Sequence, residues 1–186
     1  EYVLNKVACA ALVTAAEFKT SDYLGMLREL APELATSAPG ALAAAKLPSL
    51  KSIIRVGADP TPGMLNFDAV VDSGRNGDPA TLDALGADLD PEDAINIQFT
   101  SGTTGAPKGA TLSHVNIVNN GRFVVGAQNL TERDRLCIPV PLYHCFGMVM
   151  GSLGCVTTGA AMIFPSEGFD ADSCLRALAD ERCTAV

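Results

Sequence analysis

The segment from Leu136 to Ser166 contains no Asp, Glu, Lys or Arg, and it constrains the fold more than any other feature of the sequence. A charge-free stretch of this length either crosses a membrane or lies buried inside the protein. Three prolines and four glycines interrupt it and no basic cluster flanks it, which argues against a membrane span. We therefore expect a buried helix between two strands, with the Gly147 and Gly151 pair in close contact with a sheet.

Short apolar runs alternate with segments of helical periodicity along the rest of the chain. The sequence predicts strands at 7–16, 52–57, 94–99, 136–140 and 160–164, with helices capped by Ser21, Ser113 and Asp170. This order predicts an α/β fold, in which a layered, mostly parallel sheet is connected by crossover helices. The residues expected to face inward from the last two helices are Val115, Ile117, Val118, Phe123 and Val124, and Ala171, Cys174, Leu175 and Leu178.

Four segments follow from this pattern, within one domain by default. Residues 1–73 hold the first β/α units, and 74–93 form an acidic, solvated surface connection with one short helix. Residues 94–130 form a strand, a glycine-rich loop and a helix, and 131–186 form further β/α units. The last residues, 182–186, resemble the opening of a buried strand.

Composition excludes some classes of function. The 186 residues carry a net charge of −8 without a Lys/Arg cluster, so we expect no nucleic-acid partner. Six cysteines without a CxxC pair lie in apolar runs, where thiols behave as small hydrophobes, and they favour a reducing compartment. The first residues show no targeting signal, so the cytoplasm is the expected location.

The loop from Thr100 to Gly109 is the best candidate for chemistry. Its three glycines let backbone N–H groups converge on an anion, four hydroxyl residues add donors, and Lys108 supplies a cation. It is not a Walker A loop, because Pro107 precedes the lysine and Gly109 follows it. The alternative is a flexible surface loop, which the apolar strand leading directly into this segment makes the weaker hypothesis.

The segment Thr-Ser-Gly-Thr-Thr-Gly-Ala-Pro-Lys-Gly at 100–109 resembles the phosphate loop of the adenylate-forming (AMP-binding) superfamily. The longer match across 95–120, with Pro-Leu-Tyr-His-Cys-Phe-Gly at 141–147, is similar to the acyl-CoA synthetase branch, and within it to medium-chain enzymes resembling family member two. The resemblance runs through all 186 residues, as an interior slice of the large N-terminal domain without the C-terminal domain.

The resemblance implies a fatty-acid (acyl) CoA ligase. In that reaction a carboxylate attacks ATP to give acyl-AMP and pyrophosphate, and CoA then takes the acyl group. Positioning and electrostatic stabilisation dominate such a step. The residues implied to hold the phosphates of MgATP are Thr100, Ser101, Gly102, Thr103, Thr104, Gly105 and Lys108, with Thr104 also near Mg²⁺.

His144 is the second implied site residue, beside the substrate carboxylate and acyl tunnel. Taken alone, a histidine in an apolar run is more often a hydrogen-bonded core group. Met148 and Met150 are candidates for lining the tunnel, although core filling is the simpler role for both. His114, near a helix start, is expected to be structural.

Three parts of the family pattern are missing: a Tyr-Gly-x-Thr-Glu turn, a Thr-Gly-Asp on the ribose side of the loop, and a C-terminal lysine domain. No complete catalytic set is therefore expected, and the chain alone is expected to be inactive. Adenylation of an amino or aryl acid and a non-catalytic phosphate-binding module remain alternatives. Exposed sheet edges predict self-association, and mitochondria are the alternative location for a eukaryotic parent.

Overall fold

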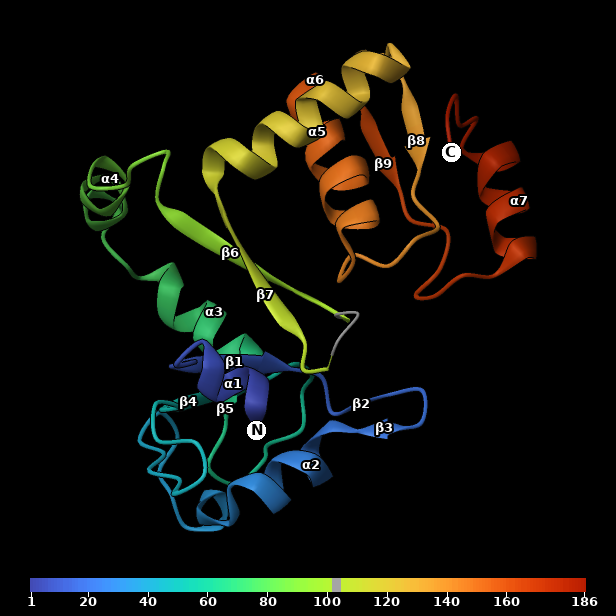
Figure 1. The fold of residues 1–186 in the computed structure, drawn as a ribbon. Helices are drawn as coiled ribbons and strands as arrows, with labels where there is room; N and C mark the ends of the chain where they lie inside the picture. Colours follow the sequence, from blue (N-terminus) through green and yellow to red (C-terminus); the bar gives the residue numbers. More distant parts are fainter. Residues whose placement is uncertain (102–104) are drawn as a thin grey trace. The chain divides into compact units, whose positions relative to one another are not determined.

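The computed structural model describes residues 1–101 and 105–186 of the chain, which form two compact units, Glu1–Leu85 and Gly86–Val186 (Figure 1). The predicted α/β class is confirmed in both. Three strand pairs are parallel, β1–β4, β4–β5 and β8–β9, whereas β2–β3 and β6–β7 are antiparallel hairpins. Helical elements connect β1 to β4 and β8 to β9, as expected for this class, whereas a turn without a helix connects β4 to β5.

The first unit is built on a parallel sheet in the order β1–β4–β5. Its strands and the flanking elements are α1 (Tyr2–Lys6), β1 (Ala11–Thr14), β2 (Glu17–Phe18), β3 (Ser21–Asp22), α2 (Tyr23–Leu30), the 3₁₀ helix η1 (Pro32–Ala35), β4 (Ser52–Arg55) and β5 (Leu65–Asn66). The strands predicted at 7–16 and 52–57 are present but shorter, and α1 was not predicted. Beneath the sheet lies an apolar core that includes Leu27, Leu34 and Ile53, none more than 5% exposed.

The predicted cap of α2 is wrong by one residue. Ser21 lies in β3, and the side chain of Asp22 accepts a hydrogen bond from the Gly25 backbone N–H at 2.8 Å. Both residue types are good caps, so composition alone does not choose between them. The two-residue strand that pairs Ser21 with Phe18 decides the position.

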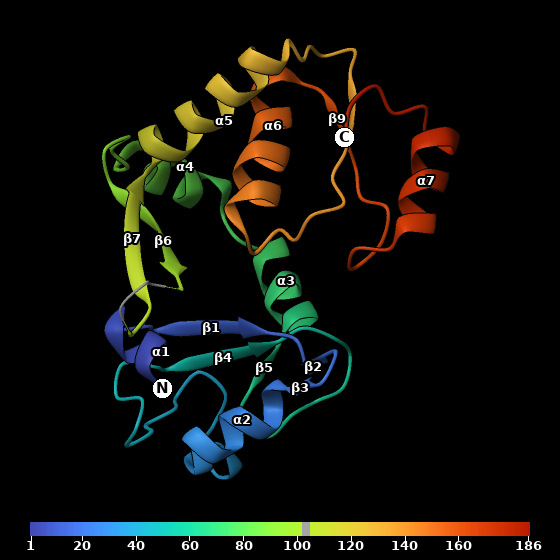
Figure 2. The same ribbon diagram turned by 45° about the vertical axis from the view of Figure 1, so that its right-hand side comes forward.

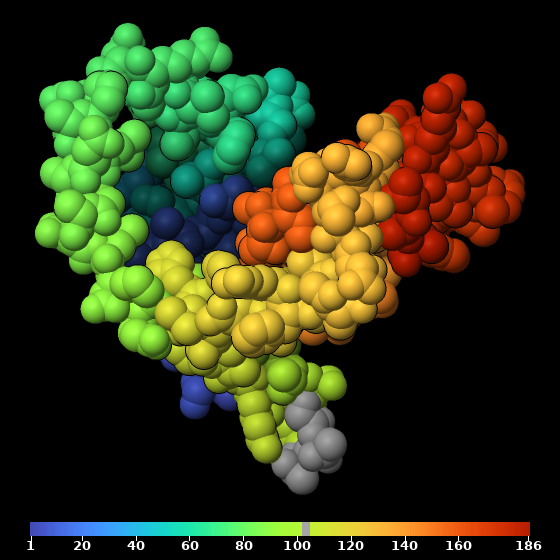
Figure 3. All heavy atoms as spheres, turned by 90° about the horizontal axis from the view of Figure 1, so that it is seen from above, coloured from blue at the N-terminus to red at the C-terminus, as the bar shows by residue number. Residues whose placement is uncertain are grey.

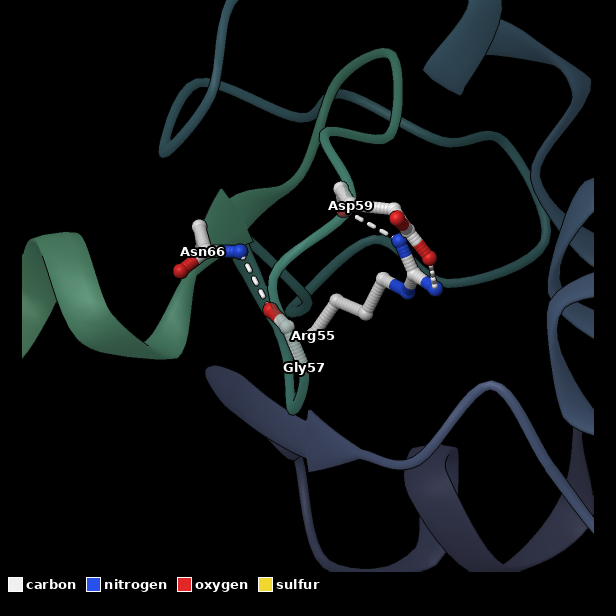
Figure 4. A network of polar contacts seen from close by, with 4 residues as sticks. All are labelled: Arg55, Gly57, Asp59 and Asn66. Carbon is white, nitrogen blue, oxygen red and sulfur yellow. Dashed lines mark hydrogen bonds and ion pairs between the residues drawn. The ribbon is translucent and has the colours of Figure 1, made fainter.

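The turn after β4 is held by polar contacts (Figure 4). Arg55 forms an ion pair with Asp59 at 2.9 Å, and Asn66 donates a hydrogen bond to the carbonyl oxygen of Gly57. Asn66 also caps the following helix, α3 (Phe67–Arg75), by accepting from the Asp68 N–H. The helix α4 (Pro79–Ala87) then crosses the boundary between the two units, and the acidic side chains of 74–93 are exposed as predicted.

The second unit opens with an antiparallel hairpin, β6 (Ala94–Thr100) and β7 (Lys108–Ser113), followed by α5 (His114–Gln128). Ser113 caps α5 as predicted, and Asn116 completes a capping box by accepting from the Ser113 N–H at 2.9 Å. The strand β7 was not predicted, because Lys-Gly-Ala-Thr-Leu-Ser carries little β-forming character of its own.

The predicted inward face of α5 is partly wrong. Val118 is 42% exposed and Phe123 is 70% exposed, whereas the buried positions are Gly121 and Val125. A Cβ on Gly121 would lie 3.2 Å from backbone atoms of the neighbouring helical segment. The contact is therefore made by a small residue that allows close approach of two backbones, which a search for large apolar side chains overlooks.

The remaining elements form a layered β/α arrangement. They are β8 (Arg135–Cys137), the π-helix η2 (Phe146–Leu153), α6 (Gly154–Thr158), β9 (Ala161–Ile163) and α7 (Ala171–Asp180). Figures 1 and 2 show α6 and α7 on opposite sides of the β8–β9 sheet. Ala185 forms a parallel bridge with Leu136, so the end of the chain pairs with β8.

The charge-free stretch forms a helical segment between β8 and β9, as predicted. A Cβ on Gly147 would meet the backbone of Pro141, and one on Gly151 would meet the Ile138 side chain at 3.0 Å. Both glycines make a close contact, but with the segment that follows β8 and not with a strand as expected. None of the helices in the described ranges has the length and apolar character needed to cross a bilayer.

Helix α7 begins as predicted, because Asp170 accepts a hydrogen bond from the Ser173 N–H at 2.8 Å. The Ser173 side chain and then its backbone N–H lower the pKa of the Asp170 carboxyl by hydrogen bonding to it. Of the four residues predicted to face inward, Cys174 is buried and Leu178 is half-buried, whereas Ala171 and Leu175 are exposed.

Candidate functional site: a glycine-rich hairpin and an apolar cavity

The hairpin β6–β7 carries the glycine-rich loop. Thr100 and Lys108 form its last described pair, and the Thr100 hydroxyl donates to the Lys108 carbonyl oxygen at 3.5 Å. The loop therefore joins two strands, and not a strand and a helix as the sequence predicted. Of the predicted phosphate-binding residues, Thr100, Ser101, Gly105 and Lys108 are described and exposed.

Gly102, Thr103 and Thr104 lie outside the described residues, and the prediction made for them stays a prediction. The same holds for the proposed contact of Thr104 with MgATP. Lys108 takes part in none of the ion pairs recorded for the described parts of the chain, so no carboxylate there neutralises its charge. An exposed cation without an acidic partner is suited to an anionic ligand.

The two described glycines of the loop have different roles. Gly105 has a φ of +130°, a conformation that residues with a Cβ rarely adopt. Gly109 lies within β7 opposite Phe99, and a Cβ there would come within 2.9 Å of the Ile97 side chain. The sequence interpretation assigned a bend to both, but Gly109 serves the packing of side chains over the hairpin.

His144 lies on the exposed segment between β8 and η2. Its Nδ1 accepts a hydrogen bond from the Phe146 N–H at 3.1 Å and lies 3.8 Å from the Cys145 sulfur. The alternative of a buried core histidine is therefore wrong. Cys145 is exposed as well, in contrast to the small-hydrophobe role expected of all six cysteines.

An apolar cavity of about 310 Å³ lies beside this segment. One wall is the end of β8 and the residues after it, and the other is η2. The lining residues are Gln128, Leu136, Cys137, Ile138, Pro139, Val140, Phe146, Met150, Gly151 and Val186. Met150 thus lines the cavity, whereas Met148 does not appear in its lining.

Met148 connects the cavity side to the hairpin. Its thioether accepts a weak hydrogen bond from the Gln98 amide of β6 at 4.0 Å, and its backbone N–H donates to the His144 carbonyl oxygen at 3.0 Å. The strand that leads into the glycine-rich loop is therefore in contact, through the Met148 side chain, with the helical segment that follows His144.

The whole chain, residues 1–186, matches the model of the AMP-binding enzyme family. It belongs to that family. The chain is 44% identical to a mitochondrial medium-chain acyl-CoA ligase of Danio rerio and 46% identical to that of Homo sapiens, covering 100% and 99% of this chain and 31% of each relative. The chain thus spans about a third of the length of these curated relatives.

The fold of the AMP-binding family is also evident from solved structures. An anthranilate CoA ligase in complex with anthranoyl-AMP superposes with a TM-score of 0.71 at 22% identity, covering 98% of this chain and 31% of the other. At this identity the likeness establishes the fold. It places the chain in the N-terminal part of an adenylate-forming enzyme, as the sequence resemblance indicated.

Sequence reasoning missed three features of the site: β7, the π-helix and the cavity. The charge-free stretch was a signal for the cavity, because it pointed to apolar walls on both β8 and η2. No signal pointed to the π-helix. Within the described residues no cluster of His, Cys, Asp and Glu is suited to hold a metal ion.

Proposed function

We propose that this chain is the phosphate-binding segment of an AMP-forming acyl-CoA ligase, acting within a longer parent enzyme. The parent joins a carboxylate to the α phosphorus of ATP, releases pyrophosphate, and transfers the acyl group from acyl-AMP to CoA. The observation that carries the proposal is the hairpin β6–β7, whose open end presents the unneutralised Lys108 beside a loop of hydroxyls and glycine.

The loop contributes charge stabilisation and not a nucleophile. Negative charge develops on pyrophosphate as the α–β phosphate bond breaks, and Lys108 together with the hydroxyl and N–H donors of 100–105 follows that charge. The substrate is MgATP, and the phosphates supply most of the ligands of its metal ion, with Thr104 the candidate hydroxyl from this chain. CoA is the second co-substrate.

The proposed acid is a fatty acid of medium length. Its support is the apolar cavity, whose volume of about 310 Å³ lies at the lower end of the ~300–1,000 Å³ usual for ligand pockets. His144 lies on the segment that adjoins the cavity, where it is available to the carboxylate end of an acyl chain. The names of the two vertebrate relatives specify medium-chain substrates for those proteins.

The cellular compartment is proposed from the cysteines and from the names of the relatives. The six cysteines are free thiols, which supports a reducing compartment, the cytoplasm, or the mitochondrial interior for a eukaryotic parent. The vertebrate relatives are named as mitochondrial. The acidic net charge supports small-molecule partners rather than nucleic acid.

Acid-dependent exchange of pyrophosphate into ATP tests the proposal in the full-length parent. We expect exchange with octanoate, and slower exchange with benzoate or free amino acids. Lys108→Ala should lower the exchange rate by about 10²-fold, a size typical of a lost donor to developing charge. Lys6→Ala is the matched control, because it removes an equivalent exposed cation from α1.

Three outcomes would contradict the proposal. Faster exchange with an amino or aryl acid would assign the parent to another adenylating branch. Unchanged exchange in Lys108→Ala would remove the assigned role of the hairpin. Absence of exchange with every acid, combined with ATP binding, would favour the non-catalytic module instead.

A further inference from the structure

The apolar cavity between β8 and η2 has a closed side and an open side, which the exposure of its lining residues tells apart. Cys137 and Ile138, from the β8 wall, are 1% and 4% exposed, and Gly151 of η2 is buried. Phe146, at the start of η2, is 51% exposed, and Val186 is exposed as well. The cavity is therefore closed where Ile138 and Gly151 meet, and it opens toward Phe146.

The closed side of the cavity is held by the backbone. A Cβ on Gly151 would lie 3.0 Å from the Ile138 side chain, so the two walls already touch there. The Ile138 N–H donates to the Ile163 carbonyl oxygen at 2.8 Å, and the Cys137 N–H donates to the Ala185 carbonyl oxygen at 2.9 Å. In Figure 3 the red atoms of α7 and the end of the chain lie against the light-orange atoms of the β8 region. Because backbone pairing holds both edges of this segment, the closed side has little freedom to widen around a ligand.

The open side of the cavity adjoins His144. The Phe146 N–H donates to His144 Nδ1 at 3.1 Å, which ties the imidazole ring to the start of η2. In the proposed function, His144 serves the carboxylate end of the acid. An acid bound in this way keeps its carboxylate at the open side and directs its methyl end toward Ile138 and Gly151.

The Met150 side chain lies between the two sides. Met150 is half-buried, lines the cavity, and follows Phe146 by about one turn of η2, directly before Gly151. A methionine side chain is unbranched and has three rotatable bonds, so it fills whatever space its neighbours leave. Met150 is therefore the lining side chain that is best placed to determine how much of the cavity an acyl chain can occupy.

We propose that Met150 limits the length of the acyl chain that the parent enzyme activates. This inference rests on the proposed function, because it concerns the acid held in the same cavity. The Met150 side chain fills space that a longer acid would need, and the fixed contact of Ile138 with Gly151 offers no other space beyond it. A smaller side chain at this position should admit longer acids, and a larger one should favour shorter acids.

The chain-length preference of the full-length parent tests this inference. Acid-dependent exchange of pyrophosphate into ATP is measured as kcat/KM with hexanoate, octanoate, decanoate and dodecanoate. Met150→Ala should raise the ratio of decanoate to octanoate by about 10-fold, the size expected when an apolar pocket gains room for further methylene groups. Met150→Phe should raise the ratio of hexanoate to octanoate by about as much.

Met148→Ala is the matched control. It removes the same type of side chain from the same helix, and Met148 is not among the residues that line the cavity. Both ratios should stay as in wild type. The ratios are the readout because damage to the fold lowers the rate with every acid alike, whereas a change in the available length affects long and short acids differently.

The outcomes separate this inference from the proposed function. Unchanged ratios in both Met150 variants, or an equal loss with every acid, would overturn the role of Met150 while wild-type exchange with octanoate still supports the proposed function. Absence of exchange by wild type with all four fatty acids would contradict the proposed function, and the inference would fall with it.

Discussion

At the scale of single residues, backbone conformation singles out Gly105. Its φ of +130° excludes a side chain on conformational grounds alone, because a Cβ there would meet nothing within 4 Å. Gly105→Ala should cost about 1–3 kcal/mol of unfolding free energy. Gly86→Ala, in α4 and equally free of contacts, should be neutral or stabilising by up to ~1 kcal/mol. Urea denaturation of the two variants measures the difference, and equal effects would show that the strain assigned to Gly105 is absent.

Asp134 provides a pH-dependent prediction. The Thr184 hydroxyl donates to its carboxylate at 2.8 Å, and Thr131 donates through its backbone N–H and its hydroxyl, so the pKa of Asp134 lies below its ordinary value. A lowered pKa means that the folded state favours the ionised form. The stability that it adds is complete above the ordinary pKa of about 3.9 and is lost as the pH falls through the lower folded value.

The measurement is the unfolding free energy of wild type and Asp134→Asn from pH 7 to pH 3. We expect wild type to be more stable than Asp134→Asn at neutral pH. The difference in unfolding free energy between the two proteins should narrow in acid. Asp88→Asn changes an exposed carboxylate in the acidic segment and serves as the control. A gap that stays constant down to pH 3 would contradict the assigned hydrogen bonds.

At the scale of elements, the π-helix depends on a residue without a side chain. A Cβ on Gly147 would lie 2.5 Å from the Pro141 carbonyl oxygen, which is backbone and cannot move aside cheaply. Gly147→Ala should therefore destabilise the fold by about 1–3 kcal/mol. Gly126→Ala, in α5 with open space around it, should not. Thermal unfolding compares them, and a stable Gly147→Ala would mean that η2 is not anchored to the 140–141 backbone.

The elements differ in how far the sequence predicts them. The strands at 94–99, 136–140 and 160–164 were found because their apolar runs are bounded by turn residues, and Ser113 and Asp170 were found because caps have a local signature. Strand β7 owes its structure to pairing with β6, and the exposed Phe123 shows that periodicity alone does not identify a buried face. Tertiary contacts determine both, so the sequence alone does not reveal them.

The sequence likewise predicted only part of the candidate site. The hairpin residues and His144 were singled out from the motif resemblance, and their binding roles stay predictions. The cavity between β8 and η2 and the link from Gln98 to Met148 each join positions far apart in the sequence. Only the folded chain brings such positions together.

At the scale of the whole molecule, the chain covers 31% of the vertebrate relatives. We expect residues 1–186 alone to show no exchange of pyrophosphate into ATP with octanoate. The reason is that these residues do not include the family motifs expected to hold adenine and ribose. The same assay on the full-length parent is the positive control. Robust exchange by the 186-residue chain would show that it holds a complete site.

The most direct test of the central claim is a crystal structure of the full-length parent with MgATP. The account predicts that the β and γ phosphates lie at the open end of the β6–β7 hairpin, with the Lys108 Nζ atom about 3 Å from a phosphate oxygen. A triphosphate bound elsewhere, with Lys108 directed into solvent, would contradict it.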